Sequence, residues 1–116
     1  ALIRNSAGEF VEPTLETVTA AAAGVVLAPG TDFRVSITNA DGARSYPIAS
    51  YTWLLVKTDN PDGAKARALR DFLDWMITPE AQKLAADLGY APLPDDVSAL
   101  VRERIRSLKT GGRPIT

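Results

Sequence analysis

The chain has 116 residues, of which 46% are hydrophobic and 23% are charged, and this composition is typical of one ordinary globular domain. Thirteen basic and fourteen acidic residues give a net charge of -1, which argues against nucleic acid as the main partner. Cysteine and histidine are both absent, which excludes disulfides, thiol nucleophiles, histidine metal sites and serine-histidine-aspartate catalysis. Composition does not exclude lysine-based or paired-carboxylate chemistry, but no motif supports an enzyme, so we expect no enzyme, no cofactor and no metal site.

The first half of the chain predicts short extended segments around one helix. Ala1–Arg4 has the character of a strand, and "NSAGE" follows it as a turn. A short helix is expected between Thr14, as its N-cap, and Gly24, as its C-terminal glycine. Apolar and polar residues alternate over Phe33–Ile37, which predicts a half-buried strand, and the Asp-Gly of "NADGARS" predicts a turn after it.

The most informative stretch is "SYPIASYTWLLVK", which runs from Ser45 to Lys57. Pro47 has no amide hydrogen to donate, so it belongs at the start or on the edge of a strand. Tyr51–Val56 is an almost unbroken run of large and apolar residues, which predicts a strand buried on both faces. Such a strand requires layers packed on each side of it.

The second half predicts three helices. Asn60 or Asp59 can cap the first, with Pro61 in its first turn, and Thr78 followed by Pro79 begins the second, which Gly89 ends. The third starts at Asp95 and Asp96, where negative charge suits the helix dipole. The tail "TGGRPIT" is expected to be loose. Apolar residues at helical spacing form a stripe on the first helix (Leu69, Phe72, Leu73, Met76) and on the third (Val97, Leu100, Val101, Ile105, Leu108).

Several features could carry chemistry, but none forms a complete active site. The basic run "RERIRSLK" and the pair Asp71 and Asp74 are both better explained as solvated helix faces. The aromatic residues could form a carbohydrate-stacking platform, although core packing explains them better. The helix starts at Thr14, Asn60 and Thr78 could present amides to an anion, a weak signal because every helix has such a start. No run of apolar residues approaches the roughly 20 that a membrane-spanning helix needs.

The order of four phrases is specific: "NSAGEFVEPTLETVTAAAAG", "DFRVSITNADGARSYPIASYTWLLVK", "ALRDFLDWMITPEAQKLAADLGYAPLP" and the closing basic helix. Together they resemble the carboxyl-terminal part of the phosphate-binding proteins (PstS type) of bacterial phosphate ABC transporters. The resemblance covers essentially the whole chain. The start "ALIRN", without a methionine, fits the expectation that the chain is the end of a longer protein.

This resemblance implies an α/β fold: a fragment of the two-lobed periplasmic binding protein (type II) fold, with strands followed by a helical C-terminal half. Residues 1–45 would be the last piece of the second lobe, and residues 46–57 the return hinge crossing and a central strand. Residues 58–116 would then complete the first lobe with helices. Phe33–Ile37 should accordingly share few contacts with the helices, whereas Trp53 and Leu55 should pack against them.

The resemblance also limits what this segment can do. The ligand motifs of the family, including a serine-glycine-threonine run, lie upstream, so no phosphate-binding residue is expected within the segment. Pro47, Ser50 and Thr52 are the residues expected near the hinge and the cleft. Phosphate and the membrane permease of the ABC transporter are the expected partners, with no role for nucleic acid. The expected location is periplasmic or extracytoplasmic, and a lipid anchor in the full-length protein is compatible with it.

Two other interpretations remain open from the sequence. The chain could be a stand-alone interaction module without ligand binding, or it could belong to a binding protein for another oxyanion such as sulfate or molybdate. A signal peptide and a Ser-Gly-Thr motif in the upstream sequence would favour the phosphate-binding interpretation over both.

Overall fold

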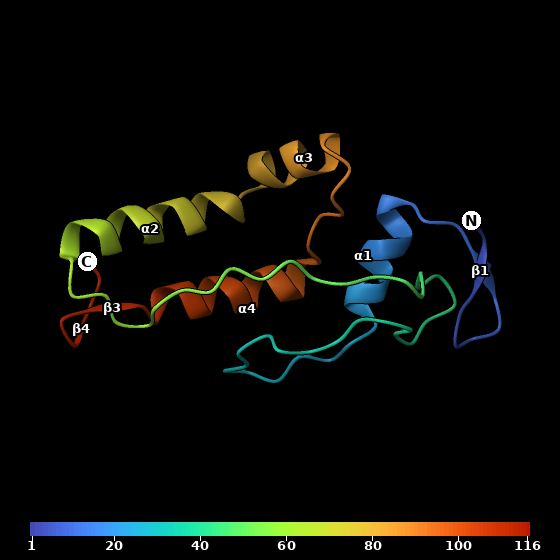
Figure 1. The fold of residues 1–116 in the computed structure, drawn as a ribbon, viewed down its shortest axis with the longest axis horizontal. Helices are drawn as coiled ribbons and strands as arrows, with labels where there is room; N and C mark the ends of the chain where they lie inside the picture. The colour runs from blue at the N-terminus through green and yellow to red at the C-terminus, as the bar shows by residue number, and fades with distance from the viewer.

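The computed structural model describes residues 1–116 and consists of four helices and two small β-hairpins (Figure 1). The first hairpin pairs β1 (Ile3–Arg4) with β2 (Phe10–Val11), and the second pairs β3 (Lys109–Thr110) with β4 (Arg113–Pro114). The helices are α1 (Leu15–Ala23), α2 (Gly63–Met76), α3 (Pro79–Asp87) and α4 (Asp95–Arg106). The chain is therefore mixed in class, and no larger sheet forms.

The predicted starts of α1 and α3 are confirmed. Thr14 and Thr17 form a reciprocal capping box at α1, and the Thr78 hydroxyl accepts the amide of Ala81 at α3. The predicted cap of α2 is wrong, because its N-cap is Asp62, whose carboxylate accepts the amide of Lys65 at 3.0 Å. Pro61 disfavours helical geometry for the residue before it, so the helix begins only after the proline.

The carboxyl-terminal core lies between α2, α4 and the closing hairpin. Leu73, Ile77, Ile105 and Leu108 are buried together there, with Leu69 and Met76 packed at the margin. The predicted stripe on α2 is right except for Phe72, which is 52% exposed and stacks on Trp75 with ring centroids 5.9 Å apart. Phe72 borders the buried line of α2, and no element of the chain covers it.

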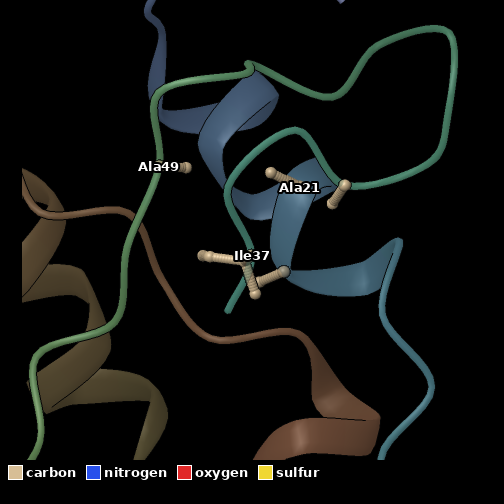
Figure 2. Packing of buried hydrophobic residues seen from close by; sticks show 5 residues of the cluster. Ala21, Ile37 and Ala49 are labelled. Atoms are coloured by element: carbon tan, nitrogen blue, oxygen red, sulfur yellow. The ribbon is translucent and has the colours of Figure 1, made fainter. Parts of the chain in front are cut away.

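The amino-terminal core is built almost entirely from alanines. Ala21 and Ala22 of α1 pack against Ile37, Ala40 and Ala49, which come from the irregular segments that wrap the helix (Figure 2). Gly24, expected as a C-terminal glycine, does end α1, but with ordinary helical dihedrals. A Cβ atom at this position would collide with the carbonyl oxygen of Asp41, so the close approach of the loop is what requires a glycine.

Two predicted strands do not form. The residues over Phe33–Ile37 alternate in burial as expected, but they pair with no neighbour, and Phe33 has a left-handed φ of 62°. Tyr51–Val56 runs extended between the two cores without a strand partner, and Leu55 is 99% exposed. The burial predicted for this run is therefore wrong in the chain as it stands, because only its end residues, Tyr51 and Val56, pack against a core.

The tail is also more ordered than expected. Gly111 and Gly112 both have positive φ, as a type I′ turn demands, and they close the hairpin in which Lys109 opposes Pro114 and Thr110 opposes Arg113. Ile115 packs at the margin of the carboxyl-terminal core.

The overall shape is elongated, with extents of 50 × 28 × 18 Å and a radius of gyration of 16.1 Å. A compact chain of this length would have a radius of gyration of roughly 13 Å. The two cores lie toward opposite ends and share no residue, as the sequence predicted for Phe33–Ile37 and the helices. The prediction that Trp53 and Leu55 pack against the helices is wrong, and of the crossing run only Val56 joins the carboxyl-terminal core.

Candidate functional site

The segment that crosses between the two cores contains all three residues that the sequence placed near a cleft. Pro47 is buried, and its carbonyl accepts the amide of Asn39 at 2.8 Å. Ser50 and Thr52 are exposed on the same segment, and the Ser50 hydroxyl donates to the neighbouring carbonyl of Tyr51. Ser50 also lines a hollow in the surface.

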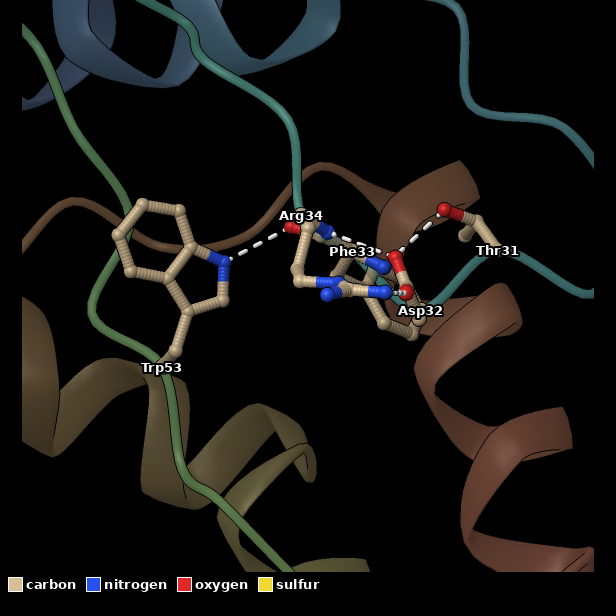
Figure 3. Close-up of polar contacts among 5 residues, drawn as sticks. All are labelled: Thr31, Asp32, Phe33, Arg34 and Trp53. Carbon is tan, nitrogen blue, oxygen red and sulfur yellow. Dashed lines mark hydrogen bonds and ion pairs between the residues drawn. The ribbon is translucent and has the colours of Figure 1, made fainter.

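This hollow is an open groove of about 630 Å³ between the crossing segment and the loop before Ile37. Its lining residues come from both segments: Arg34, Val35, Ser36, Ser50, Trp53 and Leu55. The indole nitrogen of Trp53 donates to the carbonyl oxygen of Phe33 at 2.8 Å, so it ties the crossing segment to the loop (Figure 3). The left-handed backbone of Phe33 is part of the turn that this bond holds.

Arg34 is the one cationic side chain that lines the groove, and it is already paired. Its guanidinium contacts the Asp32 carboxylate through Nη2 at 2.6 Å and Nε at 2.7 Å. The side-chain hydrogen bond from Arg34 lowers the pKa of Asp32, and the same hydrogen bond raises the pKa of Arg34. The pair thus stays charged on both sides at neutral pH, and the groove offers an entering anion no unpaired positive charge.

The helix starts proposed from the sequence as anion sites are filled by the chain itself. Thr14 and Thr78 cap their own helices, and the Asn60 side chain accepts the amide of Asp62 at 3.1 Å. The start of α4 has no side-chain cap, but Asp95 and Asp96 occupy its first turn and repel anions. Each of these helix starts thus already has either a side chain of the chain on one of its first amides or acidic residues in its first turn.

The remaining candidates also fail to converge. Asp71 is paired with the neighbouring Arg70 at 2.8 Å and lies on the exposed surface, so it does not form an acid-base pair with Asp74. The aromatic rings that contact one another form two separate pairs, Tyr51 with Trp53 on the crossing segment and Phe72 with Trp75 on α2. No group of three acidic residues is close enough to hold a metal ion, and no helix is long and apolar enough to cross a membrane.

Sequence reasoning missed the junction between the two cores. The Thr19 hydroxyl of α1 donates to the carbonyl of Pro92 at 2.9 Å, which joins α1 to the corner before α4. The hydroxyl of Tyr51 is buried nearby without a hydrogen-bond partner. Burial raises the pKa of Tyr51, and the negative charge of Asp96 adds to this shift. No local pattern in the sequence signals either contact, because each joins segments more than 40 residues apart.

Comparison with known proteins shows which proteins this chain resembles in sequence. No protein-family model matches the chain. It is 35% identical over 95 residues to the phosphate-binding protein PstS of Xylella fastidiosa (strain 9a5c), a match that covers 82% of this chain and 26% of that protein. It is 32% identical over 120 residues to the phosphate-binding protein PstS of Methanocaldococcus jannaschii, covering 94% of this chain and 31% of that protein. The PstS protein of Haemophilus influenzae is 32% identical over 104 residues.

The chain is therefore similar over most of its length to proteins that bind a solute. In particular, it is homologous over most of its length to the PstS phosphate-binding proteins, as its sequence motifs predicted. It spans only 26% to 31% of the length of these relatives. These PstS relatives are named as phosphate-binding proteins, in agreement with the prediction that the chain is not an enzyme.

Proposed function

We propose that the chain is the carboxyl-terminal segment of the extracytoplasmic, phosphate-binding component of a phosphate ABC transporter. The match to PstS proteins over most of the chain is the observation that carries this proposal. The segment would serve as a structural part of a solute receptor, whose lobes close on phosphate and whose closed form docks on the membrane permease.

The division of the chain into two packing units supports the proposed domain roles. Residues 1–45 would finish the second lobe, residues 46–57 would form the return crossing and a strand, and residues 58–116 would complete the first lobe. Two clusters with no shared residue, joined by one extended segment, are what such a division requires. Pro47, Ser50 and Thr52 would then lie on the hinge, with Ser50 closest to the cleft.

The phosphate ligands themselves would come from the part of the receptor that this segment does not include. Inside the segment, Arg34 is neutralised by Asp32, and the starts of α1 and α3 are capped by threonine side chains of the chain itself. A buried oxyanion needs several charge-assisted hydrogen bonds to replace its hydration. The chain by itself is therefore expected to have no specific affinity for phosphate.

A chimera tests the proposal directly. The matching segment of the Xylella fastidiosa PstS protein would be replaced by this chain, and binding of phosphate and of sulfate would be measured by calorimetric titration. We expect the chimera to bind phosphate and to reject sulfate, because the ligands belong to the retained part. The unmodified Xylella protein is the positive control, and this chain alone is the negative control.

Three outcomes would contradict parts of the proposal in different ways. A folded chimera that binds no anion would contradict the structural equivalence of the segment. A chimera that prefers sulfate would favour the interpretation as a binding protein for another oxyanion. Tight, phosphate-selective binding by the chain alone would show that the ligands lie within it.

A further inference from the structure

A single hydrogen bond joins the two packing units directly. The Thr19 hydroxyl donates to the carbonyl oxygen of Pro92 at 2.9 Å, and no other hydrogen bond or ion pair connects residues 1–45 with residues 58–116. A threonine inside a helix often donates to the carbonyl four residues earlier. Thr19 lies within α1, yet its hydroxyl bonds to a residue 73 positions along the chain. This bond, which we call the junction bond, therefore connects the units and does not support α1 itself.

Both ends of the junction bond lie on parts of the chain that are fixed within their own unit. Thr19 is on α1, the helix around which the amino-terminal core is built. Pro92 lies in the corner "APLP", where two proline rings fix their own φ angles and restrict the residues before them. In this corner the amide of Leu93 donates to the side-chain oxygen of Gln82 at 2.8 Å, and the Gln82 side chain donates to the carbonyl of Met76 at 2.9 Å. A change at the junction bond should therefore alter how the units are oriented and leave their internal packing intact.

The units are not packed into one core on either side of the junction bond. The two hydrophobic clusters share no residue. A groove of about 400 Å³ lies between the loop after α1 and α4, and its lining comes from both units: Val25, Val26 and Leu27 on one side, and Asp96, Leu100 and Glu103 on the other. Because no continuous core fixes the orientation of the units, one hydrogen bond can have a measurable effect on it.

We propose that the junction bond restrains the relative motion of the two lobes and thereby raises the affinity of the receptor for phosphate, an inference that rests on the proposed function. Residues 46–57 connect the units covalently at one place, and the junction bond connects them at a second. Two connections permit rotation about the line that joins them and oppose other relative motions. A receptor with fewer unliganded orientations loses less conformational entropy when its lobes close on the ligand. Thr19 is thus a positioning residue, which acts without contacting phosphate.

Distance measurements between spin labels on the chain itself test the restraint. The chain has no cysteine of its own, so labels can be placed on Asp41→Cys and Asp87→Cys, one in each unit. Thr19→Val should broaden the distance distribution, because valine resembles threonine in shape but has no hydroxyl. Thr19→Ser keeps the hydroxyl and should keep the narrow distribution. Ser6→Ala is the matched control, because the Ser6 hydroxyl also donates to a carbonyl, that of Ala40 at 3.3 Å, but within one unit.

Phosphate titration of the chimera with the Xylella fastidiosa PstS protein tests the effect on affinity. We expect Thr19→Val to raise the dissociation constant for phosphate about two- to tenfold, which corresponds to the loss of one neutral hydrogen bond. Thr19→Ser and Ser6→Ala should leave the dissociation constant unchanged.

The proposal is overturned if Thr19→Val and Ser6→Ala give the same distance distribution, or if Thr19→Val leaves the phosphate affinity of the chimera unchanged. It is also overturned if Thr19→Ser behaves like Thr19→Val, because the hydroxyl would then not be the group responsible. An unsubstituted chimera that binds no phosphate would instead contradict the proposed function. The distance measurement on the chain alone would still decide whether the junction bond restrains the two units.

Discussion

The amino-terminal unit, residues 1–49, packs five small or medium side chains around α1, whereas the carboxyl-terminal unit, residues 59–116, packs leucines and isoleucines between α2 and α4. An alanine buries much less apolar surface than a leucine, so the first core gains less from the hydrophobic effect. The second unit resembles an ordinary pair of packed helices. The first unit must obtain part of its stability from other interactions.

A buried asparagine provides the additional interactions that stabilise the amino-terminal unit. Asn5 is 6% exposed, and its side-chain amide uses every donor and acceptor that it has. The Nδ2 group donates to the carbonyls of Gly42, Ala43 and Ser45 at 3.0 to 3.2 Å, and Oδ1 accepts the amides of Ala7 and Glu9 at 3.0 to 3.1 Å. These bonds fasten the first hairpin to the loop before Pro47. A small core thus depends on a polar network to fix its irregular segments.

Asn5→Ala should cause the largest loss of stability, and this loss should be confined to the amino-terminal unit. Removing the side chain leaves several buried backbone groups without partners, so the amino-terminal unit should lose about 3 kcal/mol of stability. Hydrogen exchange of individual amides measures this, because α1 should lose protection while α4 keeps it. Asn60→Ala, in the other unit, removes one exposed hydrogen bond and is the control. Equal loss of protection in α1 and α4 would mean that the two units unfold together.

Two glycine substitutions, one in each unit, should differ in their effect on stability, and the larger of these effects should be smaller than that of Asn5→Ala. Gly24→Ala forces a methyl group against the Asp41 carbonyl, and the overpacking should destabilise the amino-terminal unit by about 2 kcal/mol. Gly63→Ala, at the start of α2, meets only ordinary contacts and has no positive φ, so it should be neutral or slightly stabilising. Urea denaturation of both variants checks the pair, and similar midpoints would refute the close approach at Gly24.

Tyr51→Phe should stabilise the junction between the units. The buried hydroxyl has no partner, so its removal should raise stability by about 1 kcal/mol. Because the pKa of Tyr51 is raised in the folded state, the neutral phenol stabilises the fold below about pH 10. This stability is lost as the pH rises through the raised pKa. Tyrosines ionise over roughly pH 8 to pH 12. Thermal melting over this range should therefore show a smaller loss of stability with rising pH in Tyr51→Phe than in the wild type.

Tyr90→Phe is the control for this measurement, because Tyr90 is 65% exposed. If the two phenylalanine variants have the same alkaline profile, the hydroxyl of Tyr51 is hydrated in solution.

Trp53→Phe should have the smallest effect on stability and a visible effect on geometry. It removes the half-exposed hydrogen bond to Phe33, which contributes about 0.5 to 1 kcal/mol, and so loosens the crossing segment from the loop. Spin labels on Asp41→Cys and Asp87→Cys, one in each unit, would report a broader distance distribution in this variant. Trp75→Phe, equally exposed but without a side-chain hydrogen bond, should leave the distribution unchanged. An unchanged distribution in Trp53→Phe would show that other contacts fix the two units.

The sequence by itself determined the helices and the separation of the cores. The bounds of α1 and α3 follow from caps whose hydrogen bonds reach only three residues along the chain, so local sequence is enough to predict them. The stripe on α4 and most of that on α2 follow from helical periodicity in the same way. Ser50 was expected near a cleft from the family resemblance, and this stays a prediction, although Ser50 lines an open groove in this chain.

Only the tertiary structure decided the extended segments, the groove and the polar network. A strand exists only where a neighbour supplies hydrogen bonds, so the apolar pattern of Tyr51–Val56 predicted a burial that the folded chain does not provide. The pairing of Arg34 with Asp32, and of Trp53 with Phe33, depends on a left-handed residue that no propensity favours. Asn5 reads locally as a turn residue, yet its side chain reaches residues about 40 positions away. Contacts of that range depend on where the whole chain runs, and no periodicity or cap encodes them.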